Sequence, residues 1–195
     1  LFFGDYILRL SANGLTKRYA AVLSIKNYPN VTSPLITDKL LTCDCEYILS
    51  NAYFPIDNQN AQSMVDKQRN RLMAVGSKAE SQIEELSILQ DDIASDKAKL
   101  GFHQMTLLVI ADDKFAVDNG IREATKKLHD AGIVCVRETL GEMPGYWGLF
   151  PGNQKFMARL SPISSENFVD FSPLHNYQQG YNCLLYTSPS PRDMW

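Results

Sequence analysis

The sequence has no long hydrophobic run: none of its 195 residues belongs to an uninterrupted apolar stretch of bilayer-spanning length. A helix that crosses the hydrocarbon core needs about 20 predominantly apolar residues, so we expect no transmembrane segment. The opening Leu1-Phe2-Phe3-Gly4-Asp5 is too short and too quickly polar for a signal peptide. The missing initiator methionine predicts a chain truncated at its N-terminus.

The sequence also lacks a surplus of charge of either sign. Nineteen Lys and Arg residues face 22 Asp and Glu residues, a formal net charge of -3, and 45% of the residues are hydrophobic. This balance gives no reason to expect nucleic acid or an anionic lipid surface as a direct partner. It is typical of a soluble globular domain with a buried core.

Cysteine and histidine are too few and too scattered for a metal site or a disulfide framework. Cys43 and Cys45 form the single C-x-C pair, whereas His103, His129 and His175 stand far apart. Structural zinc normally takes four ligands in paired spacing, so we assign no metal ligand. Reduced cysteines of a cytosolic protein are the simpler interpretation.

Signature motifs of catalysis are missing as well. The sequence has no G-x-x-x-x-G-K-[ST] phosphate loop, no G-x-G-x-x-G, no G-x-S-x-G and no H-E-x-x-H. We therefore assign no catalytic or cofactor-binding residue. An enzyme whose site joins the Asp112-Asp113 pair to His175 stays open as an alternative. An N-cap role for Asp113 explains the acidic pair more simply.

Apolar runs predict two strands over residues 6–10 and 19–25, paired as a hairpin about Asn13-Gly14. Ser33-Pro34 predicts the start of a short helix that ends near Thr42. A further strand is predicted over residues 45–54.

The stretch from residue 58 to 99 is polar and carries a helical stripe. Its members are Val65, Leu72, Val75, Ala79, Leu86, Leu89 and Ile93. One helix of this length would run roughly 60 Å, so we favour a helical hairpin that turns near Gly76-Ser77. The pair would serve either as a coiled arm for a partner or as helices packed on the domain's own sheet.

A β-α-β unit follows. Residues 104–111 form a buried-strand run, Asp113 can cap a helix that ends before Gly132, and residues 133–136 form the next strand. The element order predicts an α+β fold, a ferredoxin-like split β-α-β sandwich with a long helical insertion. We place this domain at residues 1–140.

Residues 141–182 are predicted to be a linker toward a missing motor domain. Within it, residues 155–160 suggest a strand and Ser164 suggests the cap of a short helix.

Several stretches together resemble the N-terminal domain of the CagE/TrbE/VirB family of type IV secretion and conjugation ATPases. They include residues 21–29, 107–110, 149–153, 163–168 and 173–176, so the resemblance runs from Leu1 to about Gly180. The residues that carry the motifs in the predicted linker are Pro151, Gly152, Asn153, Asn167, Phe168, His175 and Asn176.

The resemblance implies a bacterial parent protein with a C-terminal RecA-like motor that binds ATP and Mg²⁺. Family members sit at the cytoplasmic face of the inner membrane, oligomerise, and dock onto inner-membrane components through their N-terminal domains. We expect this chain to be such a docking domain, without ATPase activity of its own. Tyr146 and Trp147 are candidates either for these contacts or for packing of the linker against the motor. The alternative is a stand-alone helical adaptor that dimerises through Leu86 and Leu89.

The C-terminal residues 183–195 are expected to be foreign to the protein. Their sequence from Cys183 to Asp193 looks like the translation of a transposase-based sequencing adapter. We therefore exclude them from fold reasoning.

Overall fold

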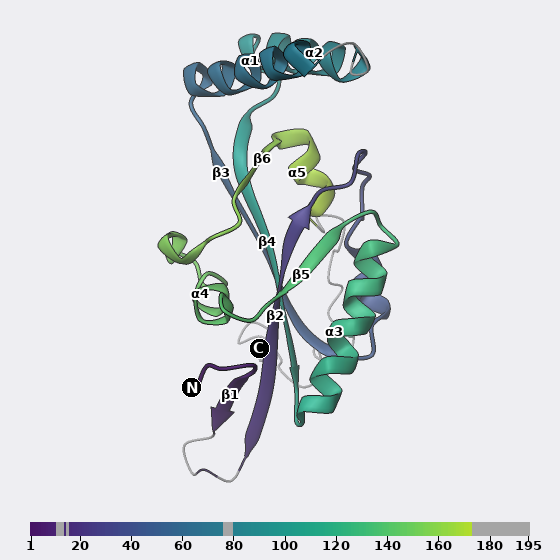
Figure 1. Ribbon diagram of the computed structural model, residues 1–195, viewed down its shortest axis with the longest axis vertical. Helices are drawn as coiled ribbons and strands as arrows, with labels where there is room; N and C mark the ends of the chain where they lie inside the picture. The colour runs from purple at the N-terminus through teal and green to yellow at the C-terminus, as the bar shows by residue number, and fades with distance from the viewer. Residues whose placement is uncertain (11–13, 15, 76–79, 173–195) are drawn as a thin grey trace, which may run out of the picture.

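The computed structural model describes residues 1–10, 14, 16–75 and 80–172. Its centre is one curled antiparallel sheet (Figure 1). The strands are β1 (Ile7–Leu10), β2 (Lys17–Asn27), β3 (Glu46–Pro55), β4 (Leu100–Ala111), β5 (Val134–Glu138) and β6 (Ser161–Ser164). The main path is β1-β2-β4-β3, while β5 also pairs with β2 and β6 also pairs with β4.

Helices lie beside this sheet and beyond one of its ends (Figure 1). They are η1 (Asp38–Thr42), α1 (Asn58–Val75), α2 (Glu80–Ala94), α3 (Lys114–His129), α4 (Glu142–Trp147), η2 (Gln154–Phe156) and α5 (Ser165–Phe171). The mixed α and β composition that the sequence predicts is thus confirmed. In the described part of the chain, no helix is long and apolar enough to cross a membrane.

The two central strands are buried on both faces, which is why they read as continuous apolar runs. Alternate residues of β2 and β4, such as Leu23 and Leu107, pack against Ile121 and Leu128 of α3 in the main core. The intervening residues Val22 and Leu108 pack on the opposite face against the α4 region. We call the sheet together with η1, α3, α4, η2 and α5 the body.

Helix α3 follows the predicted pattern closely. The Asp113 side chain accepts a hydrogen bond from the Ala116 N–H at 2.8 Å and caps the first turn. Val117, Ile121, Ala124 and Leu128 are buried on one face. Gly132, at φ +80°, takes the left-handed backbone that ends the connection to β5.

Helices α1 and α2 stand off the end of the sheet as a crossbar (Figure 1), which we call the arm. They enter from β3 and leave into β4. They pack antiparallel, with Arg69 Nη1 donating to Gln90 Oε1 at 2.7 Å, and a small cluster of Ala61, Val65, Ile93 and Leu100 lies between them and the sheet. The predicted turn at Gly76-Ser77 lies outside the described residues.

The predicted helix from Ser33 is wrong. Residues 34–37 form turns, Leu35 adopts a positive φ of 68°, and only the 3₁₀ helix η1 follows. A residue with left-handed backbone interrupts α-helical hydrogen bonding. Ile36, in the turn, and Leu40, in η1, nevertheless both pack in the main core.

The predicted strand at residues 155–160 is also wrong. Residues 154–156 form η2, and the strand β6 begins at Ser161, opposite His103 of β4. Arg159 instead pairs with Glu138 and its N–H donates to Gln104 Oε1 at 3.0 Å, so the segment is tied down by side chains.

The described residues after 140 pack on the sheet. α4 covers one face, β6 extends β4, and Phe171 of α5 is fully buried in the main core. The division of the chain at residue 140 stays a prediction, and the tail at 183–195 lies outside the described residues.

Candidate functional site

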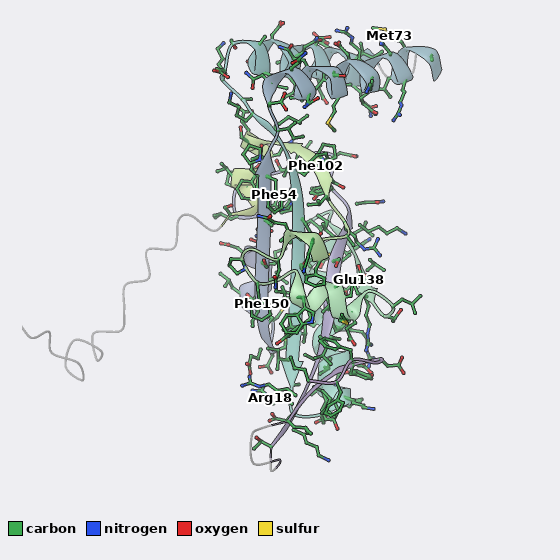
Figure 2. All side chains as sticks on the ribbon, turned by 90° about the vertical axis from the view of Figure 1, so that its left-hand side faces the viewer. Arg18, Phe54, Met73, Phe102, Glu138 and Phe150 are labelled. Carbon is green, nitrogen blue, oxygen red and sulfur yellow. The ribbon has the colours of Figure 1, made fainter. Side chains whose placement is uncertain are left out.

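A groove of about 980 Å³ lies between the arm and the β6–α5 end of the body. Both arm helices line it, as do β6, α5 and Tyr28. We call it the arm groove. Figure 2 shows the arm projecting past the body, with Met73 toward its far end.

The arm groove has both apolar and charged lining residues. Val65, Leu86, Leu89, Leu100 and Ile163 are among the apolar ones. Thus Leu86 and Leu89, predicted as dimer contacts, line the groove and are half-buried against the arm's own cluster.

Charge divides between the helices that line the groove. The basic side chains Lys67 and Arg71 come from α1, while Glu85 and Asp92 come from α2 and Glu166 comes from α5. None of these five forms an ion pair with another residue that the structure describes. These basic and acidic side chains of the groove are therefore available to a partner.

A buried polar network fixes the body wall of the groove. Tyr28 Oη lies 2.9 Å from His103 Nδ1, and His103 Nε2 lies 3.3 Å from Asn51 Oδ1. Asn51 Nδ2 in turn donates to the Phe171 carbonyl oxygen at 3.0 Å. Burial lowers the pKa of His103 to about 4, so its imidazole is neutral at pH 7. The network holds α5 against the sheet.

Two of the motif residues lie on α5. The Asn167 N–H donates to Ser164 Oγ at 3.1 Å, which confirms the predicted cap, and Asn167 itself lines the arm groove. The Phe168 ring stacks on Tyr53 with centroids 4.6 Å apart. Phe168 thus anchors α5 to β3.

Three other motif residues lie at a separate place, after α4. Gly152 takes a positive φ of 86° in an exposed turn, with Pro151 before it. Asn153 Nδ2 donates to the Trp147 carbonyl oxygen at 3.1 Å, which closes the turn onto the end of α4. His175 and Asn176 lie outside the described residues, so the structure divides the motif set between two places.

The contact candidates Tyr146 and Trp147 belong to an aromatic cluster on the α4 face of the body. The Tyr146 ring contacts Phe3, Trp147 and Phe150 edge-on, at centroid distances of 5.7, 5.3 and 5.4 Å. Phe150 remains 44% exposed, and Met143 of α4 is also exposed. We call this the α4 patch.

Asp112 and Asp113, the acidic pair, both make structural contacts. Asp113 caps α3, and the exposed Asp112 forms an ion pair with Arg18, with Oδ1 3.0 Å from Nε. Neither residue lines the arm groove. Burial raises the pKa of Cys43 and raises that of Cys45 to about 11, so neither thiol is activated. Among the described residues, no group of His, Cys, Asp and Glu could hold a metal ion.

Sequence reasoning missed Glu142. This residue starts α4 and is buried although it is charged. Burial raises its pKa from 4.5 to about 7, against the opposing effects of the Gly4 N–H and the Arg137 guanidinium, while Asp5 adds to the increase. No sequence signal marks it, because a Glu in the first turn of a helix is ordinary.

Comparison with known proteins identifies the family of the chain. The model of the CagE, TrbE, VirB family, described as a component of the type IV transporter system, matches residues 2–159. The type IV secretion system protein virB4 of Bartonella henselae is 34% identical over 164 residues, which are 84% of this chain and 21% of that protein. Its counterpart in Bartonella quintana is 32% identical over 180 residues, 92% of this chain and 23% of that protein.

Protein virB4 of Agrobacterium fabrum is 32% identical over 161 residues, 82% of this chain and 20% of that protein. The chain therefore spans about a fifth of the length of the curated relatives it matches.

Proposed function

We propose that this chain is an assembly region of a type IV secretion machine, because it belongs to the CagE, TrbE, VirB family of type IV transporter components. The observation that carries the proposal is the α4 patch. Met143 and Phe150 expose apolar surface beside a packed aromatic cluster, an arrangement common at protein contacts.

In the finer form of this proposal, the region docks onto inner-membrane components of the machine at its cytoplasmic face. It couples them to an ATPase motor that lies elsewhere in a longer, oligomeric protein, and that motor holds ATP and Mg²⁺. The spread of the family match over most of the body supports a role shared by the whole region. The chain itself is expected to have no ATPase activity.

We also propose that the body is a ferredoxin-like fold with the arm inserted between its second and third core strands. β4 lies between β2 and β3 and is antiparallel to both, and β2 lies in the same way between β4 and β5. These are two split β-α-β units in which η1 replaces the first helix and α3 is the second.

The test of docking is co-purification of the 195-residue chain with the inner-membrane components of a type IV secretion system. Phe150→Ser is expected to reduce capture at least tenfold, because it removes exposed apolar surface from the α4 patch. The matched control is Phe115→Ser on α3, where the ring is 72% exposed on the opposite side of the sheet. Equal capture by both variants would contradict docking through this patch.

The ATPase expectation has its own assay. Purified residues 1–182 should release no more phosphate from ATP than buffer does. Turnover above that level would overturn the assignment of ATP hydrolysis to another part of a longer protein.

A stand-alone helical adaptor is the second candidate, and the groove-lining positions of Leu86 and Leu89 favour it. It predicts that the chain carries out its role without a motor domain. Restored secretion in cells that lack the full-length protein but make this chain would support the adaptor and contradict the docking-domain proposal.

A further inference from the structure

The strand β3 forms the longest edge of the sheet. It pairs with β4 along its whole length, from Glu46 opposite Ile110 to Pro55 opposite Gly101, and it pairs with no other described strand. β3 has 10 residues, whereas β1, β5 and β6 at the other edges have 4, 5 and 4 residues. The far side of β3 is therefore a long strip of backbone beside which no described strand lies.

The register of β3 with β4 shows which backbone groups point away from the sheet. The Ile56 N–H donates to the Leu100 carbonyl oxygen at 2.9 Å, and this register continues without a shift to Glu46. In an antiparallel pair, residues that bond to the partner strand alternate with residues whose N–H and C=O point outward. The outward residues of β3 are Tyr47, Leu49, Asn51 and Tyr53. In the described part of the chain, no residue bonds to these outward backbone groups.

This edge also lacks the features that keep a free strand from pairing. Such strands are normally short, or they carry charge or proline. The short edge strands follow this rule, with Arg9 in β1, Arg137 in β5 and Pro162 in β6. Between Glu46 and Pro55, however, β3 has no charged residue and no proline. Its sequence is that of a strand prepared to accept another strand.

We propose that the β3 edge binds an extended, uncharged segment of a partner polypeptide, which joins the sheet as a further strand. Only another extended backbone offers donors and acceptors at the spacing that this edge requires. From Tyr47 to Tyr53 the edge spans about 20 Å, enough for a segment of about seven residues. The inference goes beyond docking through the α4 patch, because backbone groups of a different element carry it.

The side chains beside the edge indicate where the partner lies and what it presents. Ile48 is 50% exposed and lies opposite Leu108, which packs on the α4 face of the sheet. Residues directly opposite each other in an antiparallel pair share a face, so Ile48 is on the face that carries the α4 patch. A partner at the α4 patch therefore reaches the β3 edge without crossing the sheet. An added strand covers Ile48 best with apolar side chains at alternate positions.

Selection of peptides followed by hydrogen exchange tests the proposal. The bait is the 195-residue chain, and the probe is a library of random eight-residue peptides displayed on phage. Enriched peptides should carry β-branched or aromatic residues at alternate positions, with few charges and few prolines. A synthetic copy of an enriched peptide should bind with a Kd of roughly 1–100 µM, because the contact is smaller than a standard interface.

Hydrogen exchange followed by NMR locates the peptide. In the free chain, the outward N–H groups of Tyr47, Leu49 and Asn51 should exchange rapidly. With the peptide bound, their exchange should slow at least about tenfold, because each N–H gains an acceptor. The N–H groups of Ile48 and Ser50 bond to β4, so they should exchange slowly in both states.

A charged side chain on the edge provides the variant. Ile48→Lys should raise the Kd at least about tenfold, because it removes apolar surface and places a charge beside the added strand. The matched control is Val134→Lys, at a 38% exposed position of β5, which should leave the Kd unchanged. Circular dichroism checks that both variants are folded.

The peptide backbone provides a second control. Methyl groups on the amide nitrogens that face β3 should abolish binding, whereas the same number on the intervening nitrogens should not.

Four results would each overturn the proposal: outward N–H groups that are already protected in the free chain, a selection without enrichment, enriched peptides that protect residues away from β3, or equal binding by Ile48→Lys and wild type. Failure of the docking function gives a different result. Peptide binding at β3 together with no effect of Phe150→Ser on capture would support the edge and contradict docking through the α4 patch.

Discussion

The body and the arm bury their apolar side chains in different ways. The main core of the body joins residues far apart in the sequence, from Ala21 on β2 to Phe171 on α5. The arm's cluster joins Ala61, Val65 and Ile93 of two consecutive helices with Leu100, where the chain re-enters the sheet. The body thus depends on non-local packing, whereas the arm is a local unit with little buried surface and much exposed surface.

This difference indicates that the arm opens more easily than the body. A unit with few buried contacts is the part of a fold that opens most easily. The arm can therefore rearrange around a partner at modest cost, while the body keeps α3, α4 and α5 in fixed places.

The largest effect is expected at Phe171, a fully buried ring of the main core. Phe171→Ala should lower the free energy of unfolding by about 3–5 kcal/mol, because it removes a large side chain and leaves a cavity. Urea unfolding of the chain measures this loss. Val169→Ala on the same helix is the control, since Val169 is exposed. Equal effects would mean that α5 is no part of the body.

In the arm, Ile93→Ala should cost about 2–4 kcal/mol, because Ile93 is the most buried residue of the small cluster. Hydrogen exchange should increase in α1 and α2 while β2 and β4 stay protected. Ile88→Ala, at an exposed position of the same helix, should change little. Exchange that rises equally in arm and body would show that the two regions unfold together.

Glu142 tests the α4 face of the body through pH. Its pKa in the folded chain is about 7, above the ordinary value of 4.5, so the folded chain binds its proton more tightly than the unfolded chain. The favourable contribution of protonated Glu142 to the free energy of unfolding is therefore full at low pH, and it is lost as the pH rises from about 4.5 through 7. Glu142→Gln should therefore stabilise the protein by about 2 kcal/mol at pH 8 and by very little at pH 4.5.

Thermal melts at the two pH values measure this change, with Glu166→Gln as the control at an exposed position. A Glu142→Gln effect that does not depend on pH would contradict a raised pKa.

The smallest effect is expected at the cap of α3. Asp113→Ala should cost about 1 kcal/mol, because the Ala116 N–H loses its acceptor. Asp112→Ala, next to it, removes only an exposed ion pair and should cost no more than about 0.5 kcal/mol. Chemical denaturation distinguishes the two. A larger loss for Asp112→Ala would contradict the cap interpretation of the acidic pair.

Local patterns predicted the local structure well. The hairpin of β1 with β2, the strand β3 and the unit β4–α3–β5 follow from apolar runs, the Asp113 cap and Gly132. The two wrong elements lie where a longer-range contact decides. Leu35 adopts a left-handed backbone conformation, and the next residue, Ile36, packs in the main core. In residues 155–160, Arg159 bonds to Gln104 and Glu138, and the segment does not pair with a strand.

For the candidate site, the sequence predicted some of the parts but not how they come together. The sequence determined that α1 and α2 are amphipathic, that Ser164 caps α5 and that the chain belongs to its family, because these properties reside in the order of neighbouring residues.

Only the tertiary structure decided that α5 and the arm enclose a groove, that Asn167 lies in it while Asn153 lies at α4, and that Glu142 is buried. Each of these depends on strand pairing between distant segments, which brings residues together at separations that no local pattern records.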